Sequence, residues 1–143
     1  MTLEPIVIQA IVLDTNIVLD VFVFNDPAAE PLRQALAQQQ LNWLATQAMR
    51  DELARVLDYP KVAAHLGGYQ LASTDVLAEF DDHAHLVAVA PKASVTCSDA
   101  DDQKFIDLAV EHRALLLSKD NAVLSMKKRL LAHGIRAQAA INK

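Results

Sequence analysis

The chain has 143 residues, the usual size of one domain, and its 52% hydrophobic and 22% charged residues exclude an intrinsically disordered protein. Thirteen Lys and Arg residues against eighteen Asp and Glu residues give a formal net charge of −5. This acidic balance argues against a protein that coats DNA irrespective of sequence, because such binding needs an excess of Lys and Arg to neutralise phosphates.

Cysteine usage and the apolar runs predict where the protein resides. Cys97 is the only cysteine, which excludes an internal disulfide and a cysteine-cluster zinc site and favours a reducing cytoplasm. The first five residues contain Glu4 and no basic residue, so we expect no signal peptide. Asp14, Asp20 and Asp26 interrupt the longest apolar runs, well short of the ~20 residues that span a bilayer. We expect a soluble, cytoplasmic, single-domain protein with no membrane association.

The first half of the chain alternates apolar runs with segments of helical periodicity. Residues 6–13 (IVIQAIVL) are rich in β-branched residues and almost continuously apolar, as in a strand covered on both faces. Polar clusters and prolines separate the segments that follow. In chain order, these are helices at 16–24 and 28–39, a strand at 42–45, a helix from Thr46 to about Leu57, a helical turn at 62–66 and a helix at 73–85.

The second half continues the alternation. Its predicted elements are a strand at 86–89, a helix at 101–112, a strand at 114–117, a helix at 121–133 and a last strand at 135–141. Gly134 suits the position that ends a helix. Strands that alternate with helices predict a three-layer α/β/α fold with a central parallel sheet of four to five strands.

Two acidic residues follow predicted strands. Asp14 comes directly after the first strand, and Asp120 comes three residues after the strand at 114–117. Ligands of parallel α/β sheets bind beyond the carboxyl ends of the strands. Either residue alone is also explained as a helix N-cap or a turn former. The pair at equivalent strand ends favours a functional site.

Two further acids lie on helix faces that are otherwise apolar. Glu52 lies three residues after Met49 and four before Val56, and Asp102 lies three residues before Phe105. A helix keeps carboxylates off its buried face unless they are paired or bind a metal, because desolvating a charge is costly. The alternatives are a stripe edge exposed to water and a buried salt bridge to an arginine.

Together these acids predict a metal site. If they converge, mutual repulsion raises their pKa values unless a cation enters. Ligation by carboxylate oxygens favours Mg²⁺ or Mn²⁺ over zinc, and such a metal polarises a phosphate and activates a water. Asn16 and Ser118, beside two of the acids, are able to orient a water or hold a phosphate oxygen. The four predicted ligands are Asp14, Glu52, Asp102 and Asp120.

Four segments carry a family resemblance. They are residues 11–19 (IVLDTNIVL), 51–60 (DELARVLDYP) followed by Lys61-Val62, 97–109 (CSDADDQKFIDLA) and 115–121 (LLLSKDN). In this order and spacing, they resemble the PIN-domain nucleases over essentially the whole chain. The branch they resemble most is that of toxin components of toxin–antitoxin pairs (VapC-like).

The resemblance implies a three-layer fold, an acidic pocket for one or two Mg²⁺ or Mn²⁺ ions, and cleavage of single-stranded RNA. It also implies a cognate antitoxin protein and a homodimer, for which Val21, Phe22 and Phe24 offer an apolar surface. By position, the family's four metal-binding and catalytic acids fall on Asp14, Glu52, Asp102 and Asp120, its asparagine on Asn16 and its small hydroxyl residue on Ser118.

The chain departs from the family pattern in two places. Relatives often have Asp-Pro-Asp-Asp-Asp-Lys where this chain has residues 99–104 (DADDQK), so one acid is lost. Asp99 and Asp101 are both candidates for a supporting contact to the metal. Lys119 stands where a glycine commonly precedes the last acid, and its charge would either hold substrate or compete with a metal.

Basic residues supply candidate substrate contacts. The segment that contains Lys127, Lys128, Arg129 and Arg136 is interpreted either as a solvated helix face or as a flank that leads RNA to the acids. The predicted helix that carries Glu52 adds two further candidates, Arg50 and Arg55. Lys119 is another candidate.

Four other residues receive a structural interpretation. His83 and His85 are two residues apart on a predicted helix and so face apart, which argues against a metal pair. Cys97 is favoured as a small buried hydrophobe over a redox switch. Trp43 is favoured as core over an RNA-stacking platform.

The leading hypothesis is a Mg²⁺- or Mn²⁺-dependent endoribonuclease that acts as a toxin component. The alternative from another class is a non-catalytic PIN-fold module that binds RNA or protein. A phosphatase with an aspartyl nucleophile is disfavoured, because Asn16 stands where a second aspartate would be needed. Two bound divalent ions would change the formal charge from −5 to −1, so we expect weak RNA binding without metal.

Overall fold

The computed structural model describes residues 8–141, within which five strands form one parallel sheet. Their order is β3-β2-β1-β4-β5, and each neighbouring pair is parallel. The predicted three-layer fold and its strand number are confirmed. The strands are β1 (Gln9–Leu13), β2 (Leu41–Ala45), β3 (Ala84–Leu86), β4 (Leu115–Leu117) and β5 (Ala137–Gln138).

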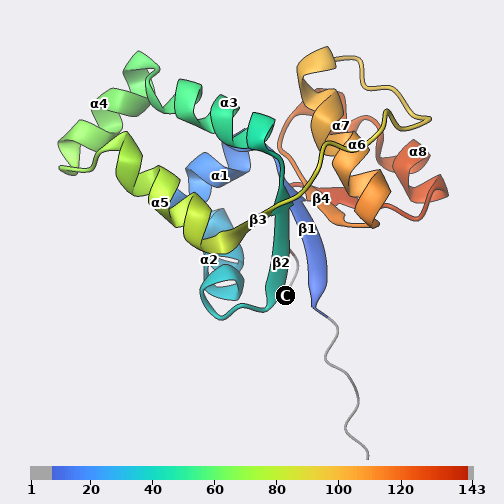
Figure 1. The fold of residues 1–143 in the computed structure, drawn as a ribbon, viewed down its shortest axis with the longest axis horizontal. Helices are drawn as coiled ribbons and strands as arrows, with labels where there is room; N and C mark the ends of the chain where they lie inside the picture. The colour runs from blue at the N-terminus through green and yellow to red at the C-terminus, as the bar shows by residue number, and fades with distance from the viewer. Residues whose placement is uncertain (1–7, 142–143) are drawn as a thin grey trace, which may run out of the picture.

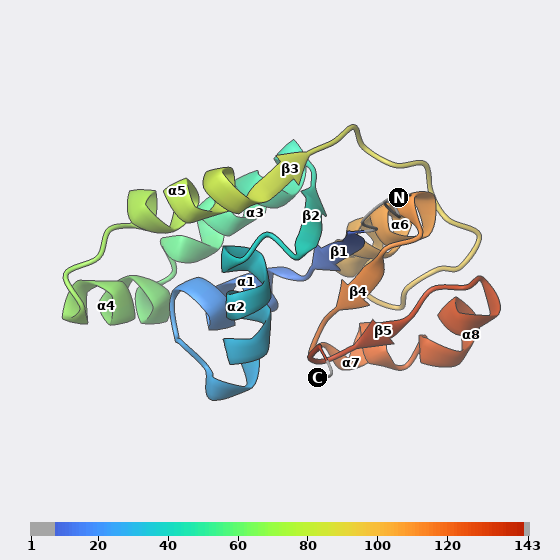
Figure 2. The same cartoon turned by 90° about the horizontal axis from the view of Figure 1, so that it is seen from below.

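Helices cover both faces of this sheet. From β1 the chain moves outward to β2 and β3, then returns to the other side of β1 for β4 and β5. Because crossovers between parallel strands are right-handed, helices before and after this reversal cover opposite faces. Figures 1 and 2 show α1–α5 on one side and α6–α8 on the other. The helices are α1 (Thr15–Phe22), α2 (Glu30–Ala37), α3 (Gln47–Leu57), α4 (Pro60–Gly68), α5 (Ser73–His83), α6 (Gln103–His112), α7 (Asn121–Leu124) and α8 (Lys127–Ala132), with 3₁₀ turns at Pro27–Ala29 and Ala100–Asp102.

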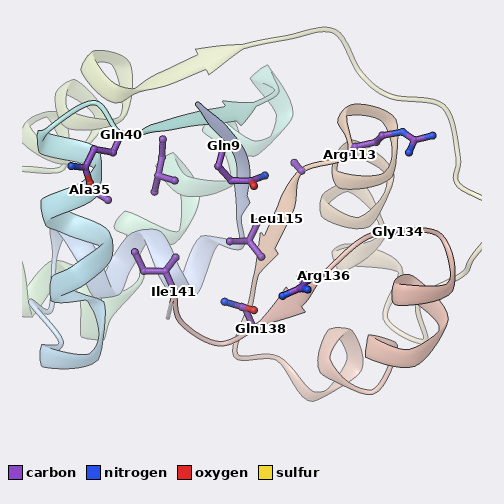
Figure 3. A pocket seen from close by; sticks show the side chains of 11 residues that line it. Gln9, Ala35, Gln40, Arg113, Leu115, Gly134, Arg136, Gln138 and Ile141 are labelled. Atoms are coloured by element: carbon purple, nitrogen blue, oxygen red, sulfur yellow. The ribbon is translucent and has the colours of Figure 1, made fainter. Parts of the chain in front are cut away.

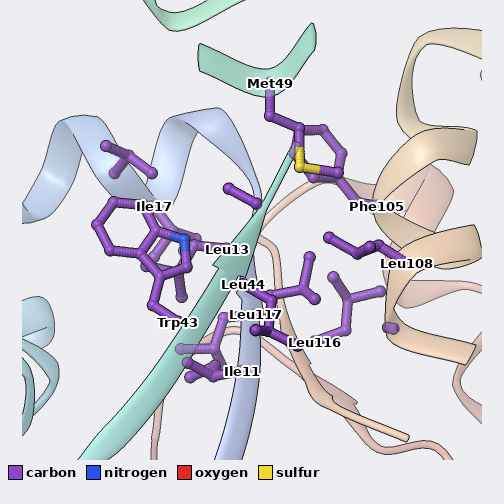
Figure 4. Packing of buried hydrophobic residues seen from close by; sticks show 14 of the residues in the cluster. Ile11, Leu13, Ile17, Trp43, Leu44, Met49, Phe105, Leu108, Leu116 and Leu117 are labelled. Atoms are coloured by element: carbon purple, nitrogen blue, oxygen red, sulfur yellow. The ribbon is translucent and has the colours of Figure 1, made fainter. Parts of the chain in front are cut away.

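The core explains why the first strand is apolar without alternation. Neighbouring residues of a strand point to opposite faces, and both Ile11 and Val12 are buried because each face carries helices. Trp43 packs edge-on against Phe80 at 5.0 Å between ring centroids, whereas Leu108 of α6 fills the other face (Figure 4). Trp43 and Cys97 are buried, as predicted.

Thr46 fixes the start of α3, the helix that carries Glu52. Its side-chain oxygen accepts a hydrogen bond from the backbone N–H of Met49 at 3.3 Å, and the residue is buried. This bond satisfies one of the N–H groups that a helix leaves free at its first turn. The cap therefore sets the position of Glu52 relative to the sheet.

Removal of this cap should destabilise the fold modestly. We expect Thr46→Ala to lower the free energy of unfolding by about 1 kcal/mol, because a buried N–H loses its acceptor. Urea denaturation measures the change. Thr46→Ser keeps the hydroxyl and should stay closer to wild type, whereas equal losses in both variants would assign the effect to the lost methyl group.

Several boundaries differ from the predictions. The helix predicted at 73–85 ends at His83, and the strand predicted at 86–89 spans Ala84–Leu86, because Ala84 pairs with Trp43 of β2. His85 therefore lies on a strand. The beginning of the strand predicted at 6–13 and the expectation about the first five residues fall outside the described residues.

The elements of the C-terminal part are shorter than its apolar periodicity predicts. The helix predicted at 121–133 is divided into α7 and α8, because the chain tightens where Met126 N–H bonds the Val123 carbonyl at 2.9 Å. The strand predicted at 135–141 contributes only Ala137–Gln138 to the sheet.

The apolar surface predicted for a dimer is smaller than expected. Val21 is buried in the core of the chain itself and is not available to a partner, which corrects that prediction. Phe22 is half-buried and stacks on Trp43, and Phe24 is exposed. No helix within residues 8–141 combines the length and apolarity needed to cross a membrane.

Candidate metal centre

The acids lie at the point where the sheet reverses its strand order. β1 and β4 are neighbours with Leu13 opposite Leu117, and Asp14 N–H donates to the Leu117 carbonyl at 3.0 Å. Asp14 and Ser118 therefore leave the sheet side by side. This switch point at the carboxyl ends of the strands is where open α/β sheets bind ligands.

Asp14 and Asp120 also cap helices. Asp14 Oδ1 accepts from Asn16 N–H at 3.3 Å at the start of α1, and Asp120 Oδ1 accepts from Ala122 N–H at 2.8 Å at the start of α7. Ser118, fully buried, connects them: its hydroxyl donates to Asp14 Oδ2 at 2.7 Å and accepts from Asp120 N–H at 3.1 Å. Both acids therefore act as helix N-caps, and their role as metal ligands stays a prediction.

Three carboxylates form a compact cluster. One oxygen from each of Asp99, Asp102 and Asp120 lies within 4.8 Å of the other two. Asp102 is only 8% exposed, and its buried Oδ2 has no hydrogen-bond partner within residues 8–141. An unpaired buried carboxylate oxygen is costly unless a cation binds it. The oxygen-only donor set and this unpartnered atom fit a hard divalent ion.

The electrostatics of the cluster favour a cation. Burial, together with the charges of Asp14 and Asp120, raises the pKa of Asp102 to about 7. Burial also raises the pKa of Asp14; hydrogen bonds from Ser118 and Asn16 oppose this, and the charges of Asp120 and Glu52 add to it. A divalent ion would relieve both the burial of charge and the repulsion.

Glu52 lies beside this cluster and has partners of its own. It accepts a hydrogen bond from the Thr15 hydroxyl and, at 2.9 Å, one from the Lys104 ammonium group. The structure brings its charge close enough to act on Asp14 but does not place it among the three clustered carboxylates. The salt-bridge alternative from the sequence is thus realised in part, with a lysine instead of an arginine.

Of the two acids predicted to support the metal, one belongs to the carboxylate cluster and the other does not. Asp99 belongs to the cluster and accepts a hydrogen bond from Asp101 N–H at 3.0 Å. Asp101 is exposed, and its carboxylate lies outside the cluster. Asn16 is exposed beside Asp14 and reaches it through its backbone N–H.

The basic residues predicted to bind substrate differ in whether an acidic side chain already pairs with them. Arg50 donates two hydrogen bonds to Asp81, at 2.8 and 2.9 Å, and this pair lowers the pKa of the Asp81 carboxyl. Lys119 contacts Asp20 rather than the acid cluster. The other basic candidates are exposed and form no ion pair within residues 8–141; they are Arg55, Lys127, Lys128, Arg129 and Arg136.

A pocket of about 630 Å³ lies at the opposite end of the sheet, where the strands begin (Figure 3). Gln9, Leu41 and Leu115 line it with Arg113 and Arg136, and no carboxylate of residues 8–141 is among its lining side chains. It is separate from the acid cluster.

Two residues of the site were not predicted from the sequence. Thr15 and Lys104 both hold Glu52, from positions 37 and 52 residues away along the chain. Thr15 lies between Asp14 and Asn16, which were predicted as site residues, and Lys104 ends the acidic segment at 99–104. Their proximity to candidate acids was the only available signal.

Comparison with known proteins agrees with this geometry. Residues 10–122, which include all four predicted ligands, match the family model described as the PIN domain, and the chain belongs to this family. PIN domains are generally metal-dependent nucleases, and the acid cluster is of the kind that could bind such a metal. No curated protein matches the chain.

Proposed function

We propose that this chain is an endoribonuclease that uses Mg²⁺ or Mn²⁺ to hydrolyse phosphodiester bonds of single-stranded RNA. The observation that carries the proposal is the buried Oδ2 of Asp102, which has no hydrogen-bond partner among residues 8–141 and lies within the carboxylate cluster at the switch point. When bound, the ion would polarise the phosphate and stabilise the charge that builds on it. The residues that would hold it are Asp14, Glu52, Asp102 and Asp120, with Asp99 in support.

The surrounding residues orient these carboxylates. Ser118 ties Asp14 to the start of the loop that carries Asp120, and both are held against the rigid ends of β1 and β4. The Thr15 hydroxyl holds the carboxylate of Glu52. A site whose ligands are held by such contacts needs little rearrangement to bind an ion.

Cleavage of a labelled single-stranded RNA tests the proposal. We expect cleavage in Mn²⁺ or Mg²⁺, none after chelation, and recovery when the metal is restored. Single-stranded DNA of the same sequence tests the preference for RNA. If RNA stays intact and divalent ions neither bind nor raise the melting temperature, the chain is the non-catalytic binding module.

Lys104 should compete with the metal for Glu52. We expect Lys104→Met to bind Mn²⁺ several-fold more tightly than wild type, because a cation 2.9 Å from Glu52 is removed. Calorimetric titration measures the affinity. Lys61→Met, which removes an exposed charge at the start of α4, is the matched control, and an unchanged affinity in Lys104→Met would mean that Glu52 takes no part in metal binding.

We further propose that the protein acts in the cytoplasm as the toxin of a toxin–antitoxin pair. The support is the resemblance of the four segments around the acids. Expression should arrest growth, and co-expression of the antitoxin from a small neighbouring reading frame should relieve the arrest. Growth arrest that no neighbouring reading frame relieves would contradict the assignment to a toxin–antitoxin pair.

We also propose a homodimer, supported by the exposed Phe24 at the end of α1. Sedimentation of wild type and Phe24→Ser tests it. The wild type should sediment as a dimer and the variant as a monomer, whereas a monomeric wild type would contradict the proposal.

A further inference from the structure

One face of α3 leads away from the acids with a regular sequence of side chains. Glu52 and Arg55 are three residues apart and share one side of α3, so Arg55 lies about 4–5 Å farther along the helix axis than Glu52. Tyr59 follows four residues after Arg55, beyond the end of α3, where it is the N-cap residue of α4. Its N–H bonds the Val56 carbonyl of α3 at 3.0 Å. Figure 1 shows α3 leaving the end of β2 and leading to α4.

Arg55 is the available cation on this face. It is exposed and forms no ion pair in the described part of the chain. Arg50, on the same helix, is already bound to Asp81 by two hydrogen bonds. The guanidinium group of Arg55 is therefore free to donate to a phosphate.

The side chain of Tyr59 is more than half exposed. The residue is 56% exposed, and its ring contacts no other aromatic ring within residues 8–141. The other strongly exposed aromatic side chains differ in this respect: Tyr69 and Phe24 both pack on the ring of His65, at 5.0 and 4.8 Å between centroids.

The surroundings of Tyr59 favour a nucleic acid over a protein partner. Asp58 and Lys61, which flank it in the sequence, are exposed, so the ring stands among charged residues. Protein-binding surfaces place an aromatic anchor in an apolar, desolvated centre. Surfaces that bind single-stranded nucleic acid combine cations that follow the backbone with isolated rings on which bases stack.

We propose that Arg55 and Tyr59 form a subsite for the nucleotides of a single-stranded RNA next to the bond at the acid cluster. Arg55 binds a backbone phosphate, and Tyr59 stacks on an unpaired base. From α3 to the start of α4 the order along the chain is carboxylate, cation and ring, which follows an RNA strand outward from the cleaved bond. The identity of the ligand rests on the proposed ribonuclease function.

Binding without cleavage tests the subsite directly. All variants are made in an Asp14→Asn chain, and fluorescence anisotropy follows two labelled RNAs of equal length, one complete and one with abasic residues throughout. We expect Tyr59→Ala to bind the complete RNA about tenfold more weakly and the abasic RNA unchanged. Tyr59→Trp should restore the affinity. Arg55→Gln should weaken both RNAs equally and reduce the salt dependence of binding by about one counterion.

Tyr69→Ala is the matched control, because it removes an even more exposed tyrosine from the other end of α4. It should leave both affinities unchanged, and equal melting temperatures should show that all variants are folded. The stacking role is overturned if the Tyr59→Ala variant binds both RNAs as tightly as its parent, or if it loses the same affinity for both RNAs. A change in self-association with unchanged RNA binding would identify a protein-binding surface and also overturns it.

The outcomes separate this inference from the proposed function. If wild type cleaves RNA but Tyr59→Ala changes nothing, the subsite fails and the nuclease stands. If wild type cleaves no RNA but binding depends on Tyr59 and on the bases, the nuclease fails and the subsite stands. A parent chain that binds neither RNA overturns the subsite.

Discussion

We expect Asp14→Asn to cleave single-stranded RNA at least about a hundredfold more slowly than wild type at saturating Mn²⁺. Asparagine keeps the shape of the side chain, so its carbonyl oxygen is able to accept from Asn16 N–H and its amide is able to face the Ser118 hydroxyl. The change therefore removes a negative charge and a metal ligand but keeps the helix cap. Burial already raises the pKa of Asp14, so the neutral variant should be no less stable at neutral pH.

Asp51→Asn is the control for this experiment. Asp51 lies on α3 next to Glu52, but it is exposed and accepts a hydrogen bond only from Gln47, at 2.9 Å, among the described residues. Its variant should cleave RNA within about twofold of wild type. Initial rates with the labelled RNA, together with melting curves of both variants, provide the measurement. Wild-type rates in Asp14→Asn would exclude Asp14 from the chemistry.

The sequence predicted the architecture because strand ends and helix faces carry local signals. The buried run before Asp14 and the run at 115–117 end in the same way, and their strands prove to be adjacent and in register. The helix break after Leu124 was missed, because Val123, Met126 and Leu130 continue one buried face across it. Periodicity reports which side of a helix is buried, and it does not report whether the helix is continuous.

The site was predictable where it depends on local position and was hidden where it depends on tertiary contacts. Asp102 was identified because a carboxylate on an apolar stripe needs a partner, and the structure leaves one of its oxygens without one in the described chain. The choice of Asp99 over Asp101 depends on how the turn at residues 99–102 is wound. The bonds from Thr15 and Lys104 to Glu52 join separate elements of the fold, and no local pattern encodes them.

The raised pKa of Asp102 has a consequence for stability. In the metal-free protein the folded state holds the Asp102 proton up to about pH 7, whereas the unfolded chain releases it near its ordinary value of 3.8. Between these values the folded state binds more protons, so its stability should fall as the pH rises and become constant above about pH 7. The full shift corresponds to about 4 kcal/mol, and because solvent screens the cluster we expect a loss on the order of 2 kcal/mol.

Asp102→Asn should therefore remove this pH dependence and the response to metal together. In chelator the variant should match wild type near pH 4 and exceed its stability at pH 8, because a buried charge is absent. At a Mn²⁺ concentration about 100 times its dissociation constant, wild type should gain about 2.7 kcal/mol and the variant almost nothing. Glu111→Gln, an exposed change on α6, should follow wild type at every pH. A variant that keeps the full Mn²⁺ stabilisation and the wild-type pH profile would show that the ion binds elsewhere, since the cluster would then lack the carboxylate whose buried Oδ2 has no hydrogen-bond partner among residues 8–141.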